Sequence, residues 1–208
     1  MSSPQRLILV LFAHPALQKS QANRRLIREP QQMEGVHFHD LYEAYPRFDI
    51  DVGYEQQLLS DHDIIVLQHP LYWYSTPAIL KEWQDLVLEH GWAYGAQGNA
   101  LQGKRWLQVV TAGGSEEAYC ARGANRLTVR QLLSPLEQTA RLCGMRFLPP
   151  FVVHGTHTIV REGLEAHAAD YHDVLLALKE NRLDEDAVSE MPRLNGDLSR
   201  CIRPRAED

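Results

Sequence analysis

The chain has 208 residues, of which 44% are hydrophobic and 23% charged, as expected of one ordinary globular domain. Its formal net charge of -6 argues against nucleic acid as a principal partner, because binding to phosphates needs a basic face. The longest apolar run, residues 7–13, is far shorter than the roughly 20 residues that span a bilayer, and no signal-like segment begins the chain. Three cysteines without a C-x-x-C pair predict free thiols. We therefore expect a cytosolic protein.

Apolar runs alternate with amphipathic segments along the chain. The runs are typical of strands, and the segments have the spacing of helices, with helix ends marked by proline or glycine. The expected strands are residues 7–13, 36–41, 63–69, 105–111 and 147–154. The expected helices are residues 20–29, 54–60, 77–91, 127–143 and 164–178. Thr76 is expected to cap the third helix, Pro30 to end the first, and residues 42–51 to be irregular. Pro135 is expected either to be tolerated in the fourth helix or to kink it.

Strands that alternate with helices five times predict an α/β fold, a doubly wound parallel sheet of five strands in a single domain. The strands at 36–41 and 147–154 look like edges, because the first is polar and the second contains Pro149-Pro150. This places them outside the apolar strands, in the order 2-1-3-4-5. Residues 1–180 would form the domain. Residues 181–208 are rich in charged residues, and their apolar residues show neither helical nor strand spacing, so this segment is predicted to be a mobile tail.

The segment from Gln68 to Trp83 passes from strand to helix through the aromatic loop Leu71-Tyr72-Trp73-Tyr74. In an open parallel sheet, ligands bind in the crevice outside the carboxyl ends of the strands, so the loop would stand at its rim. It would suit a flat conjugated ligand. Packing under a loop, or a protein–protein surface, would explain the same aromatic residues.

Two further segments would reach the same crevice. After the first strand come His14 and Ser20-Gln21-Ala22-Asn23, where side chains and helix N-terminal N–H groups could surround an anion, although Ser20 could be only a helix cap. After the fourth strand, the turn Thr111-Ala112-Gly113-Gly114 could aim backbone N–H groups at a ligand.

Several other motifs predict no site. Residues 98–104 match most of a phosphate-binding P-loop, but Arg105 stands where a serine or threonine is required. No G-x-G-x-x-G follows the first strand. The pairs His37/His39 and His154/His157 fall on opposite edges of the predicted sheet and are too few for a metal site, so we expect none. Cys120 has no basic neighbour nearer than Arg122 and is expected to be unreactive.

Five of these motifs occur together and in order. They are AHP at 13–15, SQAN at 20–23, HDLYEAYPRFDID at 39–51, QHPLYWYSTPAILKEW at 68–83 and TAGG at 111–114. On these residues the chain resembles the NAD(P)H dehydrogenase (quinone) family of flavodoxin-like fold, and most closely its glutathione-regulated potassium-efflux ancillary proteins. The resemblance covers about residues 7–178.

The resemblance implies bound FMN rather than FAD, with NAD(P)H as electron donor and a quinone-like acceptor. It places the phosphate by His14, Ser20, Gln21, Ala22 and Asn23. It places the ring between Leu71, Tyr72, Trp73 and Tyr74 on one side and Thr111, Ala112, Gly113 and Gly114 on the other. It also implies a homodimer that associates with a membrane potassium:proton antiporter, peripherally on the cytoplasmic face of the inner membrane.

The resemblance also suggests catalytic residues. Quinone reductases of this family carry a tyrosine and a histidine after the glycine turn; Tyr119 fits the first position, but Asn125 stands at the second. The leading hypothesis is an oxidoreductase that transfers two electrons with ping-pong kinetics and activates the antiporter. The alternative is a non-catalytic, flavin-binding regulatory subunit, which Asn125 favours.

Overall fold

The computed structural model describes residues 5–189 and 191–205. Its sheet has the order β2-β1-β3-β4-β5, with β6 also paired to β4, and all pairs are parallel. The strands are β1 (Ile8–Phe12), β2 (Val36–Asp40), β3 (Ile64–Pro70), β4 (Arg105–Thr111), β5 (Arg146–Phe147) and β6 (Phe151–Val153). The predicted doubly wound fold and strand order are confirmed. The predicted fifth strand is two short pieces, because Pro149 and Pro150 cannot donate hydrogen bonds to β4.

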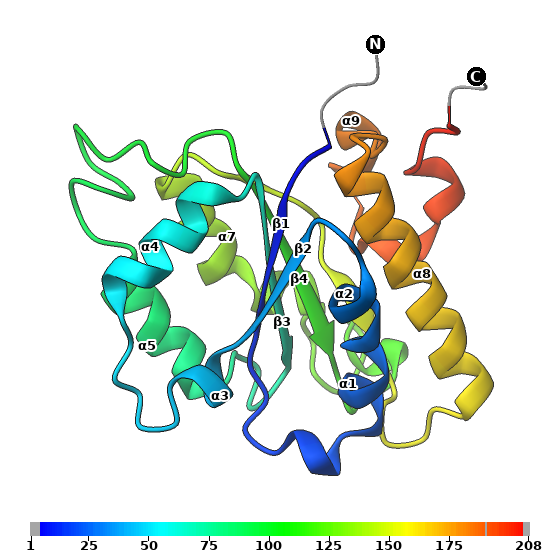
Figure 1. Ribbon diagram of the computed structural model, residues 1–208. Helices are drawn as coiled ribbons and strands as arrows, with labels where there is room; N and C mark the ends of the chain where they lie inside the picture. The colour runs from blue at the N-terminus through cyan, green and yellow to red at the C-terminus, as the bar shows by residue number, and fades with distance from the viewer. Residues whose placement is uncertain (1–4, 190, 206–208) are drawn as a thin grey trace.

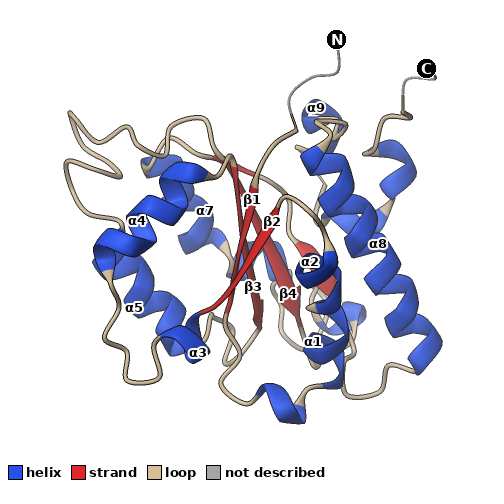
Figure 2. Cartoon of the chain, in the orientation of Figure 1, coloured by secondary structure: helices blue, strands red, loops and turns tan. Residues whose placement is uncertain are grey.

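Helices cover both faces of the sheet (Figures 1 and 2). On one face lie α4 (Val52–Asp61), α5 (Ala78–Val87) and α7 (Ser134–Leu142), and on the other α1 (Gln21–Leu26), α2 (Arg28–Gln32) and α8 (Arg161–Lys179). The remaining helical segments are η1 (Leu17–Lys19), α3 (Leu41–Ala44), η2 (Glu116–Ala118), α6 (Val129–Leu132), α9 (Glu185–Val188), η3 (Leu194–Gly196) and η4 (Leu198–Arg200).

The central strands are buried on both faces, which explains their continuous apolar sequences. Successive side chains point to opposite faces: Leu9 and Leu11 pack with the α4–α5 side, and Ile8 and Val10 with the α1–α8 side. All of them are fully buried. No helix of the described chain is both long and apolar enough to span a bilayer.

Several helix boundaries differ from those predicted. Pro30 lies inside α2 rather than ending a helix, because the first turn of a helix needs no N–H from it. The helix predicted over 127–143 is two helices, α6 and α7, which meet at Leu133, two residues before Pro135. Thr76 does not cap α5, whose N-cap is Pro77. The stretch predicted to be irregular begins within α3, which the Asp40 carboxylate caps.

The end of the chain also differs from the prediction. Instead of a mobile tail from residue 181, four side chains between residues 183 and 201 are buried in the core on the α8 side: Leu183, Val188, Leu194 and Cys201. The side chain of Asn195 exchanges two hydrogen bonds of 2.9 Å with the backbone of Val152 and so covers the free edge of β6. The residues that make these contacts lie in helical segments of three or four residues and in turns and loops, which are too short for their apolar residues to show the spacing of a helix or a strand. Residues 190 and 206–208 of the predicted tail, and residues 1–4 of the predicted domain, lie outside the described residues.

Candidate functional site

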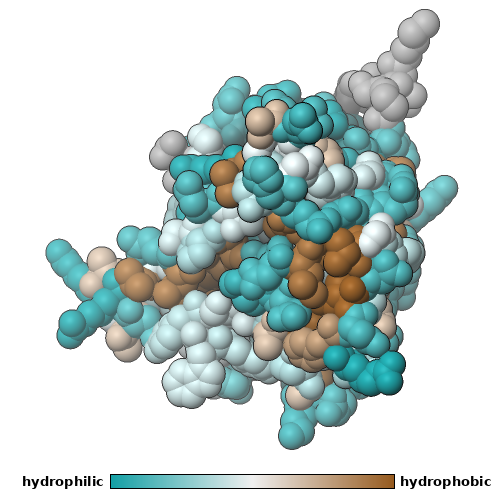
Figure 3. Space-filling model, turned by 90° about the vertical axis from the view of Figure 1, so that its left-hand side faces the viewer, coloured by the Kyte–Doolittle hydropathy of each residue, from teal (hydrophilic) through white to brown (hydrophobic). Residues whose placement is uncertain are grey.

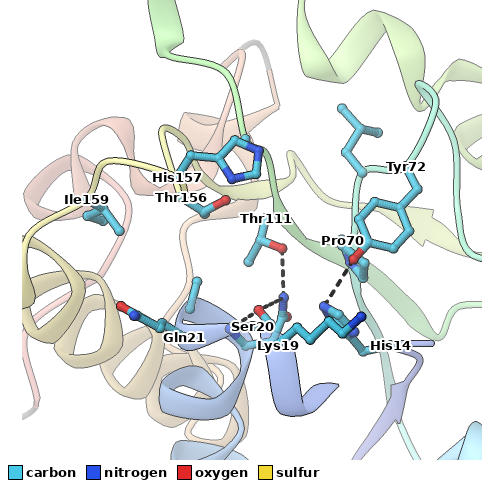
Figure 4. Close-up of a pocket in the computed structure, with 14 residues that line it drawn as sticks. His14, Lys19, Ser20, Gln21, Pro70, Tyr72, Thr111, Thr156, His157 and Ile159 are labelled. Carbon is cyan, nitrogen blue, oxygen red and sulfur yellow. Dashed lines mark hydrogen bonds between the residues drawn. The ribbon is translucent and has the colours of Figure 1, made fainter. Parts of the chain in front are cut away.

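A pocket of about 380 Å³ opens where the carboxyl ends of β1, β3 and β4 meet (Figure 4). Parallel strands bring these ends to one edge of the sheet, so loops far apart in sequence share it. The pocket is lined by His14, Lys19, Ser20, Gln21, Ala22, Asn23, Pro70, Leu71, Tyr72, Thr111, Gly113, Thr156, His157 and Ile159. The structure therefore brings together residues from all three predicted segments. Trp73, Tyr74, Ala112, Gly114, Tyr119 and Asn125 do not line it.

The loop after β1 is tied to the end of β4. Ser20 caps α1 by accepting a hydrogen bond of 3.1 Å from the Asn23 N–H. The buried Asn23 amide also donates to the Thr111 hydroxyl, at 2.9 Å. Ser20 is therefore a helix cap, and the Asn23 Nδ2 group is engaged by protein. The N–H groups of Gln21 and Ala22 at the first turn of α1 point toward the helix start, where they have no intrahelical partner.

His14 is a neutral side chain at the pocket wall. Its Nδ1 accepts a hydrogen bond from the Ala16 N–H, at 3.1 Å, so the ring proton is on Nε2. Nε2 lies 3.5 Å from the Tyr72 hydroxyl, and the two side chains point toward one another in Figure 4. Burial lowers the pKa of His14. His14 can therefore donate a hydrogen bond to a ligand, and Lys19 brings an ammonium group to the pocket lining.

The aromatic loop is a tight turn with unusual backbone conformations. Tyr72 and Ser75 exchange two backbone hydrogen bonds, and Trp73 and Tyr74 between them have φ of 46° and 66°. Glycine and asparagine favour such positions, and bulky residues there cost about 1–3 kcal/mol each. Trp73 is 92% exposed. The Tyr74 hydroxyl donates to Asn125 Oδ1 at 3.3 Å, so the turn contacts the loop after β4 and leaves only Leu71 and Tyr72 in the pocket.

The glycine turn contacts two rings. A Cβ on Gly113 would overlap the imidazole of His157, and a Cβ on Gly114 would lie 3.1 Å from the ring of Tyr119. Neither glycine has a positive φ, so both positions require glycine for space rather than for conformation. Ala112 is buried, and its N–H donates to the Val153 carbonyl.

Tyr119, Asn125 and His154 lie beside the pocket rather than in its wall. The rings of Tyr119 and His154 are 5.6 Å apart. Burial raises the pKa of Tyr119 and lowers that of His154. The tyrosine therefore holds its proton at neutral pH, and the histidine is neutral.

Sequence reasoning missed five lining residues: Lys19, Pro70, Thr156, His157 and Ile159. In the sequence, His157 stands out only as a possible partner of His154 in a metal pair. It follows the last strand by four residues, and the rule that ligands bind beyond the carboxyl ends of strands could have found it. The described residues contain no group of three or more side chains arranged to hold a metal ion.

The P-loop-like segment, residues 98–104, precedes β4 and thus lies at the amino ends of the strands, away from the pocket. Cys120 is partly exposed, and its thiol donates to the Glu117 carbonyl; Cys143 and Cys201 are buried, and all three are free.

Comparisons with known proteins agree with this arrangement. Residues 6–175 match the model of a family described as having a flavodoxin-like fold. The chain belongs to the flavodoxin-like fold family. Among the curated members, the glutathione-regulated potassium-efflux system ancillary protein KefG of Serratia proteamaculans is 51% identical over 175 residues, which cover 84% of this chain and 95% of that protein.

Solved flavodoxin-like structures resemble the chain over most of its length. General stress protein 14 of Treponema denticola, in complex with FMN, has a TM-score of 0.79 and 38% identity, covering 83% of this chain and 99% of that one. An NADPH-quinone reductase from P. pentosaceus has a TM-score of 0.74 and 32% identity, covering 81% and 96%. A protein described as a thermophilic tryptophan halogenase from Streptomycin violaceusniger has a TM-score of 0.79 and 43% identity, covering 81% and 98%. Because these descriptions differ, the reaction has to be argued from the site.

Proposed function

We propose that this flavodoxin-like chain is an FMN-dependent NAD(P)H:quinone oxidoreductase that acts as an ancillary activator of a glutathione-regulated potassium:proton antiporter. The observation that supports it most is the pocket at the carboxyl ends of β1, β3 and β4. Its lining sets the ammonium group of Lys19 and the N–H groups of α1, which would hold an anion, beside Leu71 and Tyr72, against which a flat ring would lie. The FMN complex of the Treponema relative and the description of KefG support the same proposal.

The lining residues fit FMN at both ends. The N–H groups of Gln21 and Ala22, the Lys19 ammonium and the His14 Nε2–H would hold the phosphate. Asn23 Oδ1 is buried without a hydrogen-bond partner among the described residues, so a hydroxyl of the ligand could donate to it. We propose FMN rather than FAD because the Treponema relative was solved in complex with FMN.

The ring would lie between two walls, Pro70 to Tyr72 on one side and Thr111, Gly113 and His157 on the other. Because Gly113 has no side chain, the His157 imidazole can lie against the turn and form this part of the wall. Bound FMN would supply the two-electron chemistry, taking a hydride from NAD(P)H and reducing a quinone-like acceptor with ping-pong kinetics.

The chain's own residues would orient the reactants and move a proton. The rings of His14 and Tyr72 pack edge to face at one wall, with their centroids 5.8 Å apart. His157 faces the pocket from the opposite wall and can donate a proton or a hydrogen bond to an acceptor. Tyr119, which family resemblance suggests as a catalytic residue, lies behind Gly114 and would support the turn.

A second function is favoured by Asn125. An amide cannot transfer a proton as imidazole does, and Asn125 Oδ1 is engaged by the Tyr74 hydroxyl. This fits a regulatory subunit in which flavin binds without turnover. In either case we propose a homodimer, peripheral on the cytoplasmic face of the inner membrane. The face covered by α4 and α5 carries apolar areas that association could cover (Figure 3), and Phe48, Tyr54 and Leu86 are exposed on this part of the chain.

Purification tests the proposal directly. We expect a yellow protein with about one FMN per chain, identified by extraction and chromatography, which oxidises NAD(P)H when a soluble quinone is added. A colourless protein that takes up no added flavin would contradict both functions. A protein that binds FMN but shows no turnover with any quinone would support the regulatory subunit. Light scattering would test the homodimer.

A further inference from the structure

A second hollow, of about 280 Å³, lies between α1, α2 and the beginning of α8. We call it the arginine groove. Its lining residues are Gln21, Arg24, Arg25, Arg28, Arg161, Leu164 and Glu165. It shares Gln21 with the candidate pocket. Figure 1 shows α1 beside α8, and Figure 4 shows Gln21 at the side of the pocket that faces α8.

The walls of the groove continue the walls of the pocket. Gln21, Arg24 and Arg28 follow one another at spacings of three and four along α1 and α2, so they lie on one side of these helices. On the other wall, Ile159 lines the pocket and Arg161 follows two residues later. A ligand with one end in the pocket could therefore extend into the groove.

The groove carries uncompensated positive charge. Arg25 pairs with Glu29 at 2.6 Å and with Glu165 at 2.7 Å. Arg24, Arg28 and Arg161 are exposed, and no carboxylate among the described residues forms an ion pair with them. The formal net charge of the whole chain is -6, so these three cations stand out against an acidic background.

We propose that the arginine groove binds the 2′-phosphate of NADPH and makes NADPH the preferred electron donor over NADH. This deepens the proposed oxidoreductase function and rests on it. One guanidinium group can donate two parallel hydrogen bonds to the oxygens of a phosphate. Arginine is also the residue that accommodates the 2′-phosphate in other nucleotide sites. Recognition of the unphosphorylated ribose of NADH uses a free carboxylate. The carboxylate of the groove, Glu165, is engaged by Arg25.

The experiment uses 2′,5′-ADP and 5′-AMP as probes, titrated calorimetrically into the full chain as purified. We expect 2′,5′-ADP to bind at least about tenfold more tightly, because one phosphate held by charged donors contributes roughly a factor of ten or more. Arg24→Ala, Arg28→Ala and Arg161→Ala should each remove much of that difference. Arg47→Ala is the matched control, since Arg47 is 85% exposed and paired with Asp49. The preference for NADPH over NADH in kcat/KM should fall in the same three variants.

The outcomes separate the two proposals. Binding of 2′,5′-ADP to a protein without quinone reductase activity would support the groove and contradict the enzyme. Equal binding of both probes, in a protein that does oxidise NADPH, would overturn the proposal that the groove binds the 2′-phosphate, but would leave the proposed oxidoreductase function standing. Arginine-dependent binding to vesicles containing phosphatidylserine, with no preference for 2′,5′-ADP, would also overturn it in favour of a membrane surface. Thermal melting of each variant would show that the fold is retained, as expected for exposed side chains.

Discussion

At the scale of the residue, the pocket depends on the contact between Gly113 and His157. The imidazole occupies the position that a Cβ on residue 113 would need. Any side chain there must displace His157, which can swing away because its contacting atoms are at the far end of the side chain. The pocket wall would change while the sheet behind it, where Ala112 is buried, would stay the same.

Gly113→Ala, and more strongly Gly113→Val, should therefore weaken flavin binding, by about tenfold or more for valine, and change the free energy of unfolding by no more than about 1 kcal/mol. Flavin retention on dialysis and urea unfolding measure the two effects. Gly53→Ala is the control, because its nearest contact, 3.6 Å from Asp51, is an ordinary one. Normal flavin retention in Gly113→Val would mean that residue 113 is only part of a turn.

Asn125 decides between the enzyme and the regulatory subunit. A histidine at this position can pass a proton to the forming hydroquinone, a contribution of order 10² to 10⁴ in rate. We expect slow quinone reduction by the natural chain, and a kcat at least about tenfold higher for Asn125→His with unchanged flavin content. Steady-state kinetics with a soluble quinone measures this. If the natural chain is already fast and the substitution slows it, the proton comes from another group. His157 is then the first to replace, because it lines the pocket and His154 does not.

At the scale of the element, Glu55 joins α4 to its neighbours. Its carboxylate is fully buried and accepts hydrogen bonds from Tyr45 at 2.6 Å, His39 at 2.7 Å and Trp83 at 2.8 Å. These donors lie before α4, on β2 and on α5. One side chain thus holds three segments on the same face of the sheet. Burial, and then the neighbouring Glu55 carboxylate, raise the pKa of Tyr45.

Removing the Glu55 carboxylate should strongly destabilise the fold. Glu55→Ala leaves the buried donors of Tyr45 and Trp83 and the partly buried donor of His39 without a partner, and is expected to lower the free energy of unfolding by about 3–5 kcal/mol. Glu55→Gln should cost less, because its amide oxygen still accepts. Urea unfolding measures both, with the exposed Glu82→Gln as control. A loss below about 1 kcal/mol in Glu55→Ala would show that the network contributes little.

At the scale of the whole molecule, the segment after α8 completes the core. Leu183, Val188, Leu194 and Cys201 are each at most 6% exposed and pack with Leu175 and Leu178 of α8. Arg105 of β4 and Arg146 of β5 both pair with Glu185 of α9. The segment lies beyond residue 175, where the match to the family ends.

A chain that ends at residue 180 should be strongly destabilised. Burial of each apolar side chain contributes about 1.5–3 kcal/mol, and whole domains are stable by only about 5–15 kcal/mol. We expect the shortened chain to aggregate or to melt well below the full chain. Leu194→Ala tests the same packing with a single substitution and is expected to lower the free energy of unfolding by about 2–5 kcal/mol. Leu142→Ala is the control, because the side chain of Leu142 is 62% exposed. If the shortened chain and Leu194→Ala both melt at the same temperature as the full chain, the segment after α8 is a mobile tail, as the sequence predicts.

The sequence by itself determined strands β1 to β4, the order of the sheet and the three loops that meet at the pocket. These features are written in local patterns: continuous apolar runs at β1 and β3, a polar edge strand, paired prolines near the opposite edge, and turn residues at strand ends. Only the tertiary structure decided that Trp73 and Tyr74 turn away from the pocket, that His157 closes it, that Glu55 joins three segments, and that the end of the chain is packed. Each of these depends on contacts between residues that are distant in sequence or on a local turn with unusual φ angles, and neither leaves a period in the sequence.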